Sequence, residues 1–150
     1  MPPLPGVGYQ LVHSLYAIGS GGFFGVGLGQ SKQKALYIPE PYNDFIFSII
    51  IEETGFLGGM LIISLFLVLI AAGINVAIKA KDMYGRLLST GIISVVAIQL
   101  IINVAVVTGS MPVTGVPMPF ISYGGTSLVI NLTAMGILLN ISRQIESDVR

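Results

Sequence analysis

Two long stretches without a charged residue constrain the fold of this chain more than any other feature. No charge interrupts residues 54–78, and none interrupts residues 87–142. A helix crosses the hydrocarbon core of a bilayer with about 20 predominantly apolar residues, so each stretch is long enough. Only 9% of the 150 residues are charged, against about 25% in a soluble domain. The sequence therefore predicts an all-α integral membrane protein.

The second stretch is long enough for two spans, and its middle contains a helix-breaking segment. Residues 109–119 include three prolines and two glycines, which interrupt helix and mark a loop. We therefore expect three transmembrane helices, at about 56–78, 87–108 and 120–142.

The cations predict an orientation. Lys79, Lys81 and Arg86 follow the first span, and Arg143 and Arg150 follow the third, which places both segments in the cytoplasm by the positive-inside rule. Residues 1–54 and 109–119 then lie outside. The predicted organisation is an extracytoplasmic loop region (1–54), a three-span region (55–143) and a cytoplasmic tail (144–150).

An outside segment of 54 residues needs a signal that directs it across the membrane, and the first residues of the chain do not have the pattern of a signal peptide. We therefore expect upstream helices and interpret the chain as the C-terminal part of a larger protein. The alternative is a small three-helix protein. Net charge is zero, which gives no argument for nucleic acid, and the absence of cysteine with a single histidine excludes the usual Cys/His zinc sites.

Six glycines fall within residues 19–29. A phosphate-binding loop needs a strand before it and a helix after it, and neither is evident. The simplest interpretation is a tight, close-packed loop. An anion site formed by backbone amides together with Lys32 and Lys34 is the alternative.

Four of the seven acidic residues lie within residues 39–53, next to the first span: Glu40, Asp44, Glu52 and Glu53. Acidic groups near hydrocarbon are costly and often functional. Asp44 could cap the short amphipathic helix that begins near Asn43, or act in catalysis, and the two roles are compatible. Glu52 follows at helical spacing on the side of Asp44, whereas Glu53 faces away. If two carboxylates act together in catalysis, Asp44 could therefore pair only with Glu52 or with Glu40.

Two further groups of polar residues lie within the spans. Gln99 and Asn103 share one face of the second span, and we expect them to serve packing or to line a cavity. The segment 112–127 is rich in proline, which makes it rigid, and polar residues lie where it enters the third span. Irregular backbone at membrane depth is tolerated only where it is buried in protein or lines a cavity, which favours a site that includes Pro117, Pro119, Ser122, Tyr123, Gly124 and Gly125.

Taken together, three blocks of sequence resemble the SEDS family of bacterial FtsW, RodA and SpoVE proteins, and the FtsW and SpoVE branch more than RodA. The blocks are Gln10 to Ser31 with its glycine run, Leu36-Tyr37-Ile38-Pro39-Glu40 through Asn43-Asp44 to Gly55, and Met111 to Ser127. Tyr42-Asn43 stands where many members have His-Thr. Members have about ten spans, so the resemblance implies that this chain corresponds to the last three and the large loop before them.

The resemblance implies a peptidoglycan glycosyltransferase of the bacterial cytoplasmic membrane, acting in division, elongation or sporulation. Lipid II would be polymerised with Asp44 as the catalytic base. Substrate would be bound by Lys32, Lys34, Glu40 and the Ser122–Gly125 segment, and a divalent cation could assist the diphosphate leaving group. Expected partners are a class B penicillin-binding protein and other divisome or elongasome membrane proteins. The alternatives are a lipid II flippase and an inactive partner-binding fragment.

Overall fold

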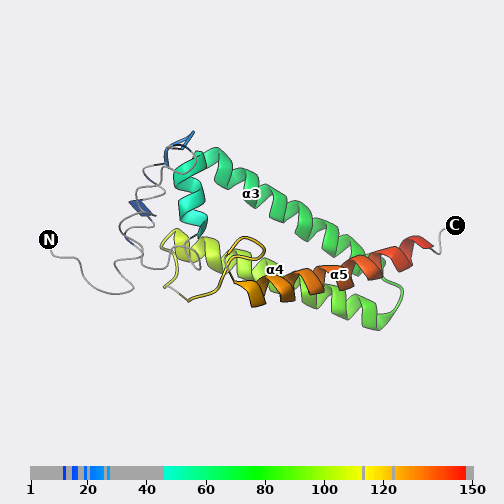
Figure 1. The fold of residues 1–150 in the computed structure, drawn as a ribbon. Helices are drawn as coiled ribbons and strands as arrows, with labels where there is room; N and C mark the ends of the chain where they lie inside the picture. The colour runs from blue at the N-terminus through cyan, green and yellow to red at the C-terminus, as the bar shows by residue number, and fades with distance from the viewer. Residues whose placement is uncertain are drawn as a thin grey trace.

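The computed structural model describes residues 46–112, 114–122 and 124–147, together with residues 12, 15, 16, 19, 21–25 and 27 of the N-terminal part. Three long helices make up most of the described chain: α3 (Ile46–Lys79), α4 (Met83–Val107) and α5 (Gly125–Ser147). They run alongside one another along the length of the molecule (Figure 1). The tight turn between α3 and α4 makes these two helices antiparallel neighbours.

All three helices are long and apolar enough to cross a membrane, which confirms the predicted all-helical fold with three spans. The largest difference from the predicted boundaries is at the third span, which begins at Gly125 rather than at Phe120. Phe120 has a φ of 64°, a left-handed conformation that a helix cannot contain. Residues 120–124 therefore belong to the loop that joins α4 to α5, and the helix continues past the predicted end at 142 to Ser147.

Helix α3 consists of two parts that differ in direction. At Gly55 the backbone leaves helical geometry, with φ 75° and ψ −175°. Residues 46–54 form a short helix, and residues 56–79 form the spanning part, which leaves the break at a steep angle (Figure 1). The break turns the short helix back toward the spanning part, so that Phe47 before it and Phe66 after it belong to the same buried cluster.

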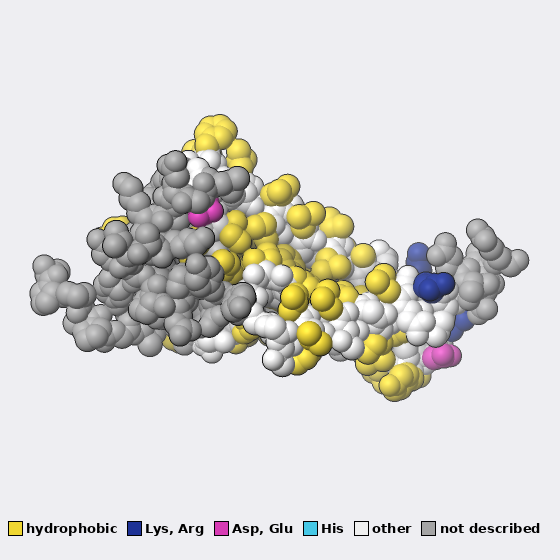
Figure 2. Space-filling view, in the orientation of Figure 1, with side chains coloured by type: hydrophobic (Ala, Val, Ile, Leu, Met, Phe, Trp, Pro, Cys, Tyr) yellow, Lys and Arg dark blue, Asp and Glu magenta, His cyan; other side chains and the backbone are white. Residues whose placement is uncertain are grey.

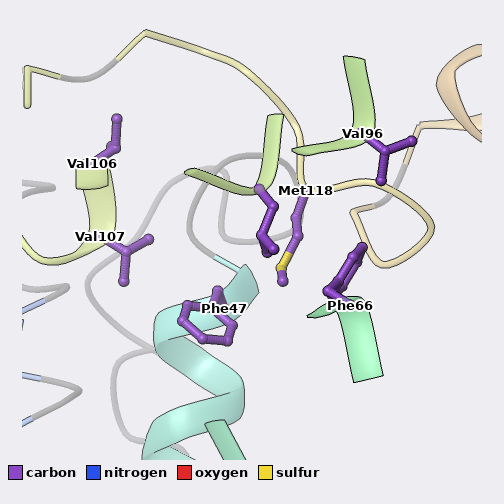
Figure 3. Close-up of a cluster of buried hydrophobic side chains, with 7 residues drawn as sticks. Phe47, Phe66, Val96, Val106, Val107 and Met118 are labelled. Carbon is purple, nitrogen blue, oxygen red and sulfur yellow. The ribbon is translucent and has the colours of Figure 1, made fainter. Parts of the chain in front are cut away.

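The core lies where the short helix, the two longer helices and the α4–α5 loop meet. Its members are buried apolar side chains: Phe47, Phe66, Val96, Leu100, Val106, Val107 and Met118. Met118 of the loop lies between Phe47 and Phe66 (Figure 3), and the ring of Phe120 stacks on that of Phe66 with centroids 6.3 Å apart. Phe66 is ten residues beyond Phe56, about 15 Å along the helix axis at 1.5 Å per residue. The loop therefore folds back between the helices to membrane depth.

The flanks of the molecule are apolar and its charges lie near the two ends (Figure 2). Large apolar side chains such as Leu65, Val68, Ile98 and Leu139 are exposed. Only 11% of the most apolar window of α5 is buried, against 33% for α4. Such a surface is unsuited to water and is typical of helices that contact lipid or other membrane helices.

Candidate functional site

Five of the residues that the sequence singled out lie outside the described part of the chain: Lys32, Lys34, Glu40, Asp44 and Tyr123. The other candidates fall in two places. Glu52 belongs to the short helix before the break in α3. The second group lies in or against the α4–α5 loop: Gln99, Asn103, Pro117, Pro119, Ser122, Gly124 and Gly125.

The break in α3 is held by the glycine run. The amide of Phe56 donates to the carbonyl oxygen of Gly22 at 2.9 Å, and the amide of Gly27 donates to the carbonyl oxygen of Glu53 at 3.2 Å. The first amides and last carbonyls of a helix have no partner within the helix. Gly22 and Gly27 thus supply partners to the two broken ends. We call the contacts of residues 22–25 and 27 with residues 53–57 the glycine clamp.

Only glycine fits at two contact points of the clamp. A Cβ atom on Gly25 would collide with the carbonyl group of Glu53, and one on Gly55 would collide with the carbonyl oxygen of Phe23 and the amide nitrogen of Gly25. Both glycines also have positive φ, 79° and 75°, which other residues rarely adopt. The conformation of Gly55, with ψ near 180°, is essentially confined to glycine.

The clamp agrees with the interpretation of the glycine run as a close-packed loop. The amides of Gly25, Gly27 and Phe56 all donate to carbonyl oxygens, so these three are not available to an anion. Sequence reasoning identified the run but not its partner. Gly55, some thirty residues away, entered only as the end of one of the blocks that resemble the SEDS family. Gly59, one turn further along α3, packs against Ile51 of the short helix.

The short helix buries one face almost completely. Ser48 and Glu52, four residues apart on that face, are 0% and 2% exposed. Glu52 thus lies inside the protein rather than at a membrane surface. Glu53 points elsewhere, and within the described residues one of its carboxylate oxygens is buried without a hydrogen-bond partner. Asp44 precedes the first described residue of this helix, Ile46, by two positions.

A reciprocal pair of hydrogen bonds closes the tip of the α4–α5 loop. The amide of Met118 donates to Oγ of Ser122 at 2.7 Å, and the amide of Ser122 donates to the carbonyl oxygen of Met118 at 3.1 Å. Met118, Pro119 and Ser122 are all buried. These bonds hold the left-handed backbone at Phe120, so the Ser122 hydroxyl has a structural role in this loop.

Helix α4 holds the same loop through Asn103. Its side-chain nitrogen donates to the carbonyl oxygen of Val116 at 3.2 Å, and the residue is 1% exposed. Gln99 lies one turn away, and within the described chain its side-chain oxygen is buried without a hydrogen-bond partner. The pair therefore faces the loop and the protein interior rather than lipid.

The described residues contain no group of three His, Cys, Asp or Glu side chains that could hold a metal ion. They do contain an apolar pocket of about 260 Å³ at the glycine clamp, lined by Gly22, Phe23, Ile51 and Phe56. The arrangement therefore places the short helix and an apolar recess together at one end of the spans.

These features define a multi-pass, all-helical membrane protein. Its three spans are joined at one end by the glycine clamp and the inserted α4–α5 loop. The chain belongs to the FtsW/RodA/SpoVE family, described as cell cycle proteins, whose family model matches residues 2–147. This confirms the resemblance seen in the sequence.

Among curated relatives, the chain is 58% identical over 138 residues to stage V sporulation protein E of Bacillus subtilis, covering 92% of this chain and 38% of that protein. It is 52% identical over 137 residues to a probable peptidoglycan glycosyltransferase FtsW of Trichlorobacter lovleyi, covering 91% of this chain and 36% of that protein. The chain thus spans under two fifths of the length of these relatives.

Two solved structures share the fold. One comes from a study of how a peptidoglycan synthase complex coordinates polymerisation and crosslinking; it has a TM-score of 0.71 and 27% identity, covering 89% of this chain and 37% of that one. The other is a mutant of the rod shape determining protein RodA of Thermus thermophilus, with a TM-score of 0.66 and 33% identity, covering 87% of this chain and 39% of that one. The lower identity to RodA agrees with a place nearer to FtsW and SpoVE.

Proposed function

We propose that the complete protein polymerises lipid II into glycan strands at the outer face of the bacterial cytoplasmic membrane. The observation that carries this proposal is the family match over residues 2–147, joined to relatives named as probable peptidoglycan glycosyltransferases. The glycine clamp supports it, because it fixes the helix that follows Asp44 against the head of a spanning helix.

In the proposed reaction Asp44 is the general base. It takes the proton from the 4-hydroxyl of the GlcNAc unit of one substrate as that oxygen attacks the anomeric carbon of the other. The bond to undecaprenyl diphosphate breaks, and the diphosphate leaves with the electron pair. Lys32 and Lys34, or a divalent cation, stabilise the charge on the leaving group. Glu40 and the segment from Ser122 to Gly125 are proposed to contact the sugars or the diphosphate.

The membrane setting suits these substrates. Their polyprenyl tails need an apolar environment beside the reacting sugars, and the exposed flanks of α3 and the pocket at the clamp provide apolar surface at the end of the spans where the short helix lies. We propose that residues 1–54 and 109–119 lie outside and that the C-terminus is cytoplasmic. A class B penicillin-binding protein is the proposed partner, which would crosslink the strands.

The test compares two isosteric variants of the complete protein, Asp44→Asn and Glu53→Gln. Asn caps a helix as well as Asp does, so Asp44→Asn should keep its membrane level and lose polymerisation of purified lipid II. Glu53→Gln should retain most activity, because Glu53 lies off the buried face of the short helix. If Asp44→Asn kept more than a tenth of the activity, a loss below about 1.4 kcal/mol in the barrier, the base would have to be another group.

Transport of lipid II is the second candidate, favoured by the buried polar side chains and the irregular loop within the spans. A flipping assay on the same two variants separates the functions. Polymerisation lost with flipping intact would support the transferase. Both lost together, in a protein that still folds, would favour a translocation path through this site.

A further inference from the structure

A groove opens between the end of α3 and the start of α4, at the end of the molecule away from the glycine clamp. It encloses about 210 Å³ and is lined mainly by apolar side chains: Ile74, Ala77, Ile78, Ile93, Thr90 and Arg86. Arg86 is exposed and is the one charged side chain among the described residues of the lining. The walls of the groove are therefore apolar, and a cation lies at one end of it.

Two contacts define the ends of this groove. Toward the middle of the helices, Gly73 lies so close to Ile93 that a Cβ atom would collide with the isoleucine side chain. At the other end, Nη2 of Arg86 donates to the carbonyl oxygen of Ala80 at 3.3 Å. That carbonyl belongs to the turn between the helices, so the hydrogen bond holds the guanidinium at the boundary between apolar and charged surface.

The same end of the molecule carries most of the described cations. Lys79, Lys81 and Arg86 lie at the turn, and Arg143 of α5 lies nearby, since Ile141 is within 3.7 Å of a Cβ atom built on Gly85. Figure 2 shows these dark-blue side chains gathered at this end, with apolar side chains beyond them. Asp82 is the one acidic side chain described there. The described side chains at this end of the molecule thus carry a net positive charge, and Arg86 is the one among them that lines the groove.

We propose that this groove binds an anionic phospholipid, with an acyl chain against Ile74, Ala77 and Ile78 and the phosphate beside Arg86. The shape and the charge favour the same ligand: an apolar cavity between two helices ends at a guanidinium that donates to the carbonyl oxygen of Ala80. Basic pockets between transmembrane helices are known to hold anionic headgroups, and a guanidinium matches phosphate geometry. The proposal is independent of the reaction at the opposite end of the spans.

The experiment is native mass spectrometry of the complete protein in detergent, titrated with phosphatidylglycerol or with zwitterionic phosphatidylcholine of the same acyl chains. Two matched pairs of variants are compared. Arg86→Gln and Arg143→Gln remove one exposed cation each, but only Arg86 lines the groove. Ala77→Leu and Ala72→Leu add the same volume to α3, but only Ala77 lines the groove. Circular dichroism verifies the helix content of each variant.

Phosphatidylglycerol should form a discrete one-to-one adduct that inorganic phosphate at equal ionic strength does not displace. Arg86→Gln should weaken it about five-fold, the effect of one cation close to an anionic headgroup, and Ala77→Leu should weaken it as well. Arg143→Gln and Ala72→Leu should leave it within two-fold. Equal losses in Arg86→Gln and Arg143→Gln, equal binding of phosphatidylcholine, or displacement by free phosphate would each overturn the proposal.

Discussion

The side-chain nitrogen of Asn103 lies 3.2 Å from the backbone carbonyl oxygen of Val116. This bond joins the interior of a spanning helix to a loop with irregular backbone, in a region where water is scarce. A loop at such depth needs internal partners for its polar groups. Asn103 supplies one of them, and the Ser122 hydroxyl supplies another. The insertion of the loop therefore depends on a few specific polar side chains as well as on apolar packing.

Replacing Asn103 by Ala should loosen the loop. The carbonyl of Val116 would lose its partner, and polar contacts between membrane helices contribute about 0.6–2 kcal/mol. We expect Asn103→Ala to lower the free energy of unfolding in detergent by roughly that amount. Asn140→Ala is the matched control, because Asn140 is exposed on α5. Equal stability of the two variants would show that the bond to Val116 contributes nothing.

Gly55→Ala should damage the glycine clamp. The substitution forces a side chain into a glycine-only conformation, at a cost of about 1–3 kcal/mol, and into collision with Phe23 and Gly25. We expect a loss of more than about 2 kcal/mol and faster hydrogen exchange at the amides of Phe56 and Leu57. Gly91→Ala is the control, since a Cβ atom there meets nothing within 4 Å. In the interior of α4 it should be neutral or stabilising by up to ~1 kcal/mol. Unchanged exchange in Gly55→Ala would contradict the clamp.

Met118→Ala should open a cavity in the core. Met118 is 0% exposed, whereas Met111 in the same loop is 39% exposed. Truncation of a fully buried methionine costs about 2–5 kcal/mol, so Met118→Ala should lower the midpoint of thermal unfolding clearly. Met111→Ala should change it little. Comparable shifts in the two variants would mean that the loop tip is not packed between α3 and α4.

The three spans could be predicted because each depends on local sequence alone, an apolar run of sufficient length. The clamp could not be predicted in the same way. Its contacts join backbone groups near Gly25 to backbone groups near Gly55, and such contacts leave no periodicity in the sequence. A glycine signals conformational freedom or close approach but does not identify the partner.

The start of α5 was placed too early for a related reason. Phe120, Ile121 and Ser122 are compatible with helix, and nothing in their identity favours the positive φ that Phe120 adopts. That conformation is imposed by the buried neighbours Met118 and Pro119 and by stacking on Phe66. The burial of Glu52 likewise depends on how the short helix packs, which helical spacing alone does not determine.

The orientation of the spans is the last prediction, and it depends on the cations at the α3–α4 turn. The chain has no cysteine, so a single cysteine introduced within it is its only thiol, and any cysteine elsewhere in the complete protein is replaced first. In the complete protein, Lys34→Cys and Thr114→Cys should react with a membrane-impermeant thiol reagent applied to intact spheroplasts, and Asp82→Cys should react only after lysis.

Thr114 and Asp82 form the decisive pair, because both are exposed and they flank α4 at opposite ends, Asp82 before it and Thr114 after it. A reagent that enters cells would label both, so labelling at one position with protection at the other excludes leakage. The physical reason is the retention of Lys79, Lys81 and Arg86 on the side of synthesis. Labelling of Asp82→Cys from outside, with protection of Thr114→Cys, would invert the topology and place the Asp44 segment in the cytoplasm, away from the surface where glycan strands are needed.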